Sequence, residues 1–168
     1  PPSPGDADAV QEGLEPLQGA GRLGAVLCQF PWSFKNSEES RKRISGIAEM
    51  LRPYPLVFEL RHGSWDTEAV RSFLETLGAG MAAIDQPVIG SSIPFRPECI
   101  SGIGYIRLHG RNYEHWFGKK GEKGGAPDAA SARYNYLYSN GEIGTIAETV
   151  RQVRSAAGVR FERSENRE

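Results

Sequence analysis

Hydrophobic residues in this chain occur in short apolar runs and in longer segments that repeat every three or four positions. The runs predict β-strands at residues 23–30, 56–60, 81–84 and 104–108. Helical repeats, with Ile44, Ile47 and Leu51 on one face and Val70 and Leu74 on another, separate the first three strands. Strands that alternate with helices indicate parallel strands joined by crossovers. We therefore expect an α/β fold built from parallel β/α units.

Capping residues predict where the helices begin. Asn36 or Ser37 is expected to cap the helix before the second strand, and Asp66 the helix after it. A short helix precedes the first strand, and a last helix runs from near residue 140 to near residue 158. Two long connections, 86–103 and 111–139, follow the third and fourth strands. Loops of this length are often functional.

Polar side chains stand at the C-terminal ends of all four predicted strands. In the second strand Phe58 and Leu60 alternate with Glu59 and Arg61, so the apolar pair should face the helices and the charged pair should point inward. The C-terminal ends of several strands are where (β/α) barrels build their sites. By the same alternation, the inward candidates are Gln29, Glu59, Arg61, Asp85, Arg107 and His109, followed by Arg111 just after the last strand.

These residue types suggest roles in binding and proton transfer. Arg107 and Arg111 would hold an anion, Glu59 or Asp85 would act as a base, and His109 as an acid. A divalent metal bound by Glu59, Asp85 and His109 is a candidate cofactor, although no local spacing motif supports it. The alternative is a buried ion-pair network without a ligand. Whether the chain is an enzyme stays open.

The connection 111–139 combines lysines with aromatic residues, among them Tyr134 and Tyr136. Basic groups hold phosphate and aromatic rings stack on bases or sugars, so the expected partner is a small phosphorylated ligand or a nucleic acid. The net charge of −1 supplies no general attraction to nucleic acid, which this connection would have to provide locally. The alternatives are a non-catalytic nucleic-acid-binding module and a solvated loop above the sheet.

Composition excludes some classes of protein. The chain is 39% hydrophobic and 24% charged, as in ordinary soluble domains. Two cysteines, Cys28 and Cys99, give neither a disulfide framework nor a metal-binding spacing, which favours a reducing, cytoplasmic setting. No apolar run reaches the roughly 18 residues of a membrane span, so we expect no membrane partner.

Four segments, LGAVLCQFPWSF, LVFELRHGSW, GYIRLHGR and ARYNYLYSNGEIGTIAETV, carry a resemblance that covers most of residues 16–158. In this order they resemble the YecE-like family, also called domain of unknown function seventy-two, which has a TIM-barrel-like fold. The resemblance implies strands four to seven of such a barrel and a site at their C-terminal ends, without an established activity. The positions that match the family's motifs are Gln29, Pro31, Glu59, Arg61, His62, Trp65, Asp85, Arg107, His109, Gly110, Arg111, Tyr134 and Tyr136.

Against that family the chain lacks the opening strands and the usual C-terminal end. We therefore expect a lead with a short helix at 1–22, a partial β/α barrel at 23–158 and a divergent tail at 159–168. Four parallel strands without neighbours expose both sheet edges, which predicts self-association. A truncated, inactive remnant is a further interpretation.

Overall fold

A computed structural model describes residues 4–88, 90–112 and 135–157 of the chain. Within them, four parallel strands form one sheet in the order β1-β2-β3-β4, which is also their order along the chain. The four strands predicted from the apolar runs are thereby confirmed, the first shorter and the third longer than expected. Their bounds are β1 (Val26–Gln29), β2 (Leu56–Glu59), β3 (Ala79–Asp85) and β4 (Tyr105–Leu108).

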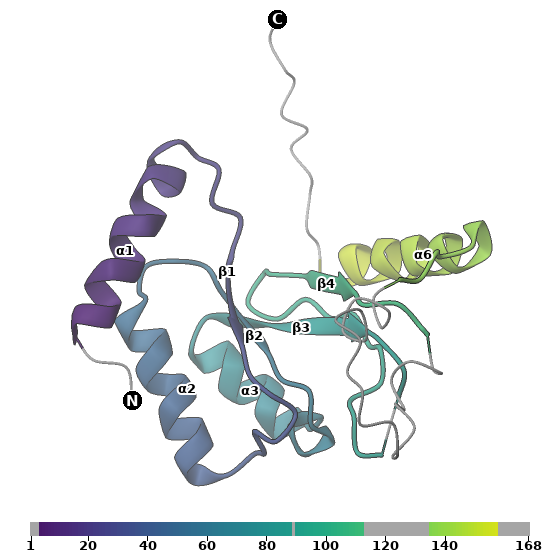
Figure 1. Ribbon diagram of the computed structural model, residues 1–168, viewed down its shortest axis with the longest axis horizontal. Coiled ribbons are helices and arrows are strands. Elements are labelled where there is room, and N and C mark those ends of the chain that lie inside the picture. Colours follow the sequence, from purple (N-terminus) through teal and green to yellow (C-terminus); the bar gives the residue numbers. More distant parts are fainter. Residues whose placement is uncertain (1–3, 89, 113–134, 158–168) are drawn as a thin grey trace, which may run out of the picture.

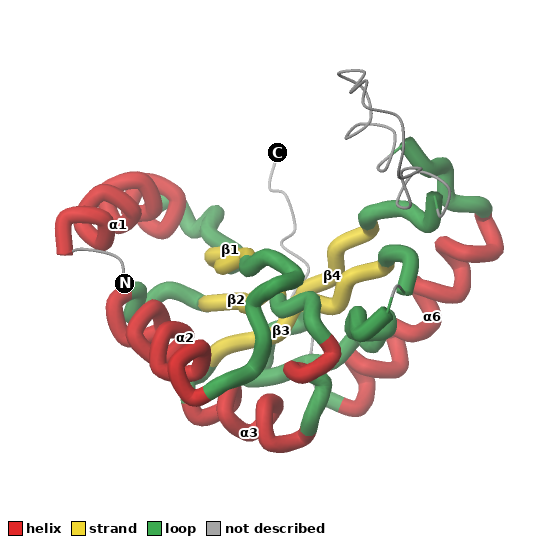
Figure 2. Tube along the Cα trace, turned by 60° about the horizontal axis from the view of Figure 1, so that its bottom comes forward, coloured by secondary structure: helices red, strands yellow, loops and turns green. Residues whose placement is uncertain are grey.

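Helices cover one side of this sheet. They are α1 (Pro4–Gly19), α2 (Glu38–Met50), the 3-10 helix η1 (Gly63–Trp65), α3 (Glu68–Thr76) and α6 (Asn140–Ala156). Figure 2 shows the strands along the inside of an arc and α1, α2, α3 and α6 along its outside. The fold is half of a TIM-like (β/α) barrel, as the alternation of strands and helices predicted.

The hydrophobic core lies between the outer face of β2 and the helices α2 and α3. Phe58 of β2 and Leu60, just after the strand, pack there with Ile44 of α2 and Leu74 of α3, and all four side chains are almost completely buried. This confirms the outward direction of Phe58 and Leu60. The inner face of the sheet is thereby left to Val57, Glu59 and their neighbours.

The start of α3 corrects one sequence prediction. Thr67, and not Asp66, is the N-cap residue, since its hydroxyl accepts a hydrogen bond from the Val70 amide at 3.3 Å. Asp66 is instead an ion-pair partner of Arg71, 2.7 Å away. Arg71 also binds Glu98 at 2.6 Å, so this arginine ties the connection 86–103 to α3. Asp66 and Thr67 are both good caps, and only the tertiary partner decided between them.

The connection between β3 and β4 folds back over the end of β2. The Ile93 amide donates to the Arg61 carbonyl at 3.2 Å, and the Gly63 amide donates to the Ser91 carbonyl. A Cβ atom at residue 63 would lie 2.8 Å from that Ser91 oxygen, so only glycine permits this approach. The connection between β3 and β4 thus holds the backbone that follows Glu59 in place.

Helix α1 belongs to the same packed unit. Leu14 packs against the core, and the Gln11 side chain donates to the Met50 carbonyl at 3.1 Å. The expected boundary at residue 22 stays a prediction. None of the helices in the described part of the chain has the length and apolar character needed to cross a membrane.

Candidate functional site

One buried carboxylate organises the inner face of the strand ends. Glu59 is 0% exposed, and its Oε1 accepts from Arg61 Nε at 2.6 Å. Its Oε2 pairs with Arg107 Nη1, and the same nitrogen lies 3.1 Å from Gln29 Oε1. Four of the predicted residues, from three strands and one strand end, therefore meet in what we call the inner cluster: Gln29, Glu59, Arg61 and Arg107.

The register explains why these side chains meet. Gln29 lies opposite Glu59, so both point to the same face of the sheet. Arg107 stands on β4 and reaches Glu59 across β3, whose residue in register with Arg107 is Ile84. Gly80 lies on the same face of β3. A Cβ atom at this position would lie only 3.1 Å from the Ile103 side chain, so glycine lets that side chain pack closely against β3.

His109 lies beside the inner cluster and is buried. Its pKa is lowered from the ordinary value, first by burial and then by the positive charge of Arg107, with Arg61 acting in the same direction and Glu59 against it. The lowered pKa favours the neutral imidazole near pH 7. The two arginines also outweigh the single carboxylate here, which makes the potential positive.

Asp85 is not part of this cluster, and the expectation that it points inward is wrong. In the register Asp85 lies opposite Leu108, on the outer face that Ile106 also shares. Before Asp85, the β3 sequence AGMAAID has only small or apolar residues at both alternating sets of positions. The hydrophobic pattern therefore does not show which of its residues face inward. The metal-binding triplet expected from Glu59, Asp85 and His109 is consequently not assembled.

The residues of 4–88, 90–112 and 135–157 also hold no other group of three or more His, Cys, Asp or Glu side chains suited to a metal ion.

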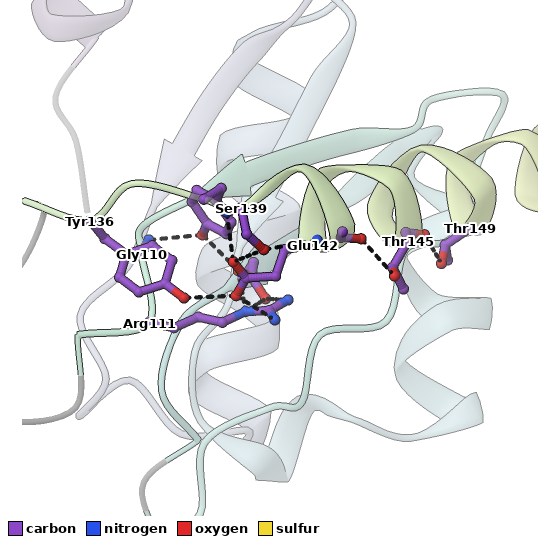
Figure 3. Close-up of polar contacts among 10 residues, drawn as sticks. Gly110, Arg111, Tyr136, Ser139, Glu142, Thr145 and Thr149 are labelled. Carbon is purple, nitrogen blue, oxygen red and sulfur yellow. Dashed lines mark hydrogen bonds and ion pairs between the residues drawn. The ribbon is translucent and has the colours of Figure 1, made fainter.

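Asp85 instead joins an outer cluster at the start of α6. Figure 3 shows Arg111, Tyr136 and Glu142 of this cluster. Arg111 places Nη2 2.9 Å from Asp85 Oδ1 and Nε 2.9 Å from Oδ2, and the Tyr138 hydroxyl donates to Oδ2 at 2.6 Å. Arg111 Nη1 also reaches Glu142 Oε1 at 3.2 Å, and the Tyr136 hydroxyl donates to that oxygen at 2.7 Å. The outer cluster is Asp85, Arg111, Tyr136, Tyr138 and Glu142.

The outer cluster holds the first turn of α6. Ser139 and Glu142 form a capping box, in which the Glu142 amide donates to Ser139 Oγ at 3.3 Å and the Ser139 amide donates to Glu142 Oε2 at 2.8 Å. The hydrogen bond from Tyr136, then those from Ser139, lower the pKa of Glu142 to about 2. Burial, then the hydrogen bond to Asp85, raises the pKa of Tyr138. These contacts join the ends of β3 and β4 to the helix.

Sequence reasoning missed two members of the outer cluster, Tyr138 and Glu142. The spacing Ser139-x-x-Glu142 was a readable capping-box signal, whereas nothing in the sequence joined Tyr138 to Asp85. His62 caps η1, because its side chain accepts a hydrogen bond from the Ser64 amide. Tyr134 and the lysine-rich part of the long connection lie in 113–134, outside the described residues.

Comparisons with known proteins agree with this architecture. The model of the family "Protein of unknown function DUF72" matches residues 3–165, which confirms the resemblance seen in the four motifs. The UPF0759 protein YunF of Bacillus subtilis (strain 168) is 28% identical over 142 residues, which are 81% of this chain and 49% of YunF.

Solved structures give the same result. A crystal structure of a DUF72 family protein from Thermotoga maritima MSB8 is 36% identical with a TM-score of 0.75, over 89% of this chain and 54% of that one. One from Enterococcus faecalis V583 is 19% identical, with a TM-score of 0.72, over 99% of this chain and 70% of that chain, and supports the fold alone. The chain thus spans about half the length of YunF and of the Thermotoga protein.

Proposed function

The chain belongs to the DUF72 family, and we propose that it binds a phosphate-bearing anion at the inner cluster. The observation that carries this proposal is that two arginines share one buried carboxylate. Glu59 has no exposed surface, and its two oxygens are engaged by Arg61 and Arg107. One negative charge faces two positive charges, so the cluster retains a net positive charge.

The guanidinium groups have donors to spare for a ligand. A guanidinium carries five N–H donors in a planar fork that fits phosphate oxygens. Arg61 binds Glu59 through Nε and Nη2, and Arg107 binds Glu59 and Gln29 through Nη1. The side chain of Arg107 is about one third exposed, and Gln29 is exposed, so a ligand can reach them.

The roles within the inner cluster follow from burial. Glu59 is committed to both arginines, so we assign it the role of positioning them rather than that of a base. His109 is the remaining candidate for proton transfer, because its lowered pKa keeps it neutral beside the arginines. Asp85 and Arg111 are assigned to holding α6, since each engages the other and further partners in the outer cluster.

Isothermal titration calorimetry with inorganic phosphate and ribose 5-phosphate tests the proposal. Arg107→Gln should weaken binding by about tenfold to a hundredfold, the value of one charge-assisted contact. Arg151→Gln is the matched control, because Arg151 is a well-exposed arginine on α6 and its loss removes the same charge. Equal affinities of the two variants, or no binding by the unaltered chain, would refute the anion site.

A further inference from the structure

The turn after β1 exposes a large aromatic side chain next to the inner cluster. Phe34 N donates to Pro31 O at 2.9 Å, which closes the turn that carries Trp32. Trp32 is 47% exposed, whereas Phe30 is buried and stacks on Phe34 with 4.1 Å between ring centroids. Phe30 and Phe34 therefore pack together, whereas Trp32 of the same turn is largely exposed to solvent.

Trp32 has an ordered aromatic partner. Its ring centroid lies 4.9 Å from that of His62, and the two planes meet at 59°, so the rings form a corner. His62 follows the end of β2, and its ring is oriented by the Ser64 amide, which donates to Nδ1 at 3.1 Å. A nitrogen that accepts this bond carries no proton, so in the neutral ring the proton lies on Nε2, which is a donor.

This corner and the inner cluster stand on the same edge of the sheet. Trp32 comes three residues after Gln29, and His62 comes directly after Arg61. Gln29 and Glu59 are partners in register, so the two segments leave the sheet side by side. The backbone thus links the aromatic corner directly to Gln29 and Arg61 of the inner cluster.

We propose that the anionic ligand is a nucleotide, whose base stacks on Trp32 while its phosphate binds Arg61 and Arg107. A base offers a flat face to the tryptophan and acceptor nitrogens or carbonyl oxygens to the donor of His62. A sugar phosphate shares the phosphate but has no aromatic face. This inference rests on the proposed anion site and adds the class of ligand to it.

Calorimetry with three probes tests it: inorganic phosphate, ribose 5-phosphate and adenosine 5′-monophosphate. The unaltered chain should bind the nucleotide about fivefold to a hundredfold more tightly than ribose 5-phosphate, as expected for one stacked base. Trp32→Ala should abolish this preference and leave phosphate affinity unchanged, and Trp32→Phe should retain part of the preference. Leu137→Ala is the control, because Leu137 is 94% exposed and lies outside both clusters.

The possible failures separate the two proposals. Equal binding of nucleotide and ribose 5-phosphate by the unaltered chain would overturn the nucleotide inference and leave the anion site standing. The same holds if Trp32→Ala weakens all three probes by one common factor, or weakens ribose 5-phosphate as much as the nucleotide. Absence of binding by every probe would overturn the anion site and the nucleotide inference together.

Discussion

Two regions of the half-barrel are held together by different forces. In the region from β1 to β3, helices α2 and α3 press buried apolar side chains onto the sheet. In the region of β4 and α6, Ile146 is the one residue of α6 that is buried, among the residues that the structure describes. Ile143 of α6 is 45% exposed and Leu108 of β4 is 43% exposed. A pocket of about 170 Å³ lies between α6 and β4, and its lining includes Ile106 and Val150. Figure 1 shows α6 near β4, toward the opposite end of the sheet from α2.

The outer cluster supplies in the second region what apolar packing supplies in the first. Asp85 and Arg111 bind the start of α6 through Glu142 and Tyr138, with charged and hydroxyl groups at 2.6 to 3.2 Å. Apolar burial is strong and has no preferred direction, whereas hydrogen bonds add modest net stability and fix orientation. The comparison teaches that α2 and α3 stabilise the fold, while α6 is oriented by a polar contact set.

Removing a core side chain from the first region should have the largest effect. Phe58→Ala should lower the free energy of unfolding by about 3 to 5 kcal/mol, because it opens a cavity beneath α2 and α3. Ile146→Ala, in the second region, should cost less than about 2 kcal/mol, since its surroundings are already incompletely packed. Urea denaturation at one protein concentration measures both. Equal losses would mean that α6 packs as firmly as α2 and α3.

Opening the outer cluster should have an intermediate and local effect. Asp85→Ala removes the partner of Arg111 and Tyr138 and should cost about 1 to 3 kcal/mol. Hydrogen exchange followed by mass spectrometry should show faster exchange in α6 and little change in β2 and α3. Tyr138→Phe, which removes one hydroxyl from the same cluster, should give a smaller change in the same direction. Unchanged exchange in α6 would contradict the assigned role of Asp85.

Acidification should produce the smallest effect, confined to the second region. The folded-state pKa of Glu142 lies near 2, below the ordinary value of 4.5, so its stabilising contribution is complete above about pH 4.5 and disappears as the pH falls toward 2. The difference in unfolding free energy between the unaltered chain and Glu142→Gln should therefore shrink across this interval. Glu148→Gln, at an exposed ion pair of the same helix, is the control. A difference that stays constant from pH 5 to pH 2 would show that Glu142 is not held by these contacts.

Much of the fold could be predicted from local pattern, and so could part of the site. At the end of β2, apolar Phe58 and Leu60 alternate with charged Glu59, which revealed that the apolar pair faces the helices and that Glu59 points inward. In β3 both alternating sets are small or apolar, so no contrast was present and Asp85 was assigned to the wrong face. The sequence shows which residues of a strand face inward only where the two faces of the strand differ in polarity.

The sequence by itself determined the order of strands and helices, the parallel topology and the strand ends at which polar groups gather, because these depend on short-range periodicity and on capping. Only the tertiary structure decided which polar groups meet. Arg107 reaches Gln29 across 78 positions of sequence, and Arg111 joins Asp85 to Glu142. Such pairs are selected by the register of neighbouring strands and by where a helix begins relative to them, and neither property is carried by any local segment of the chain.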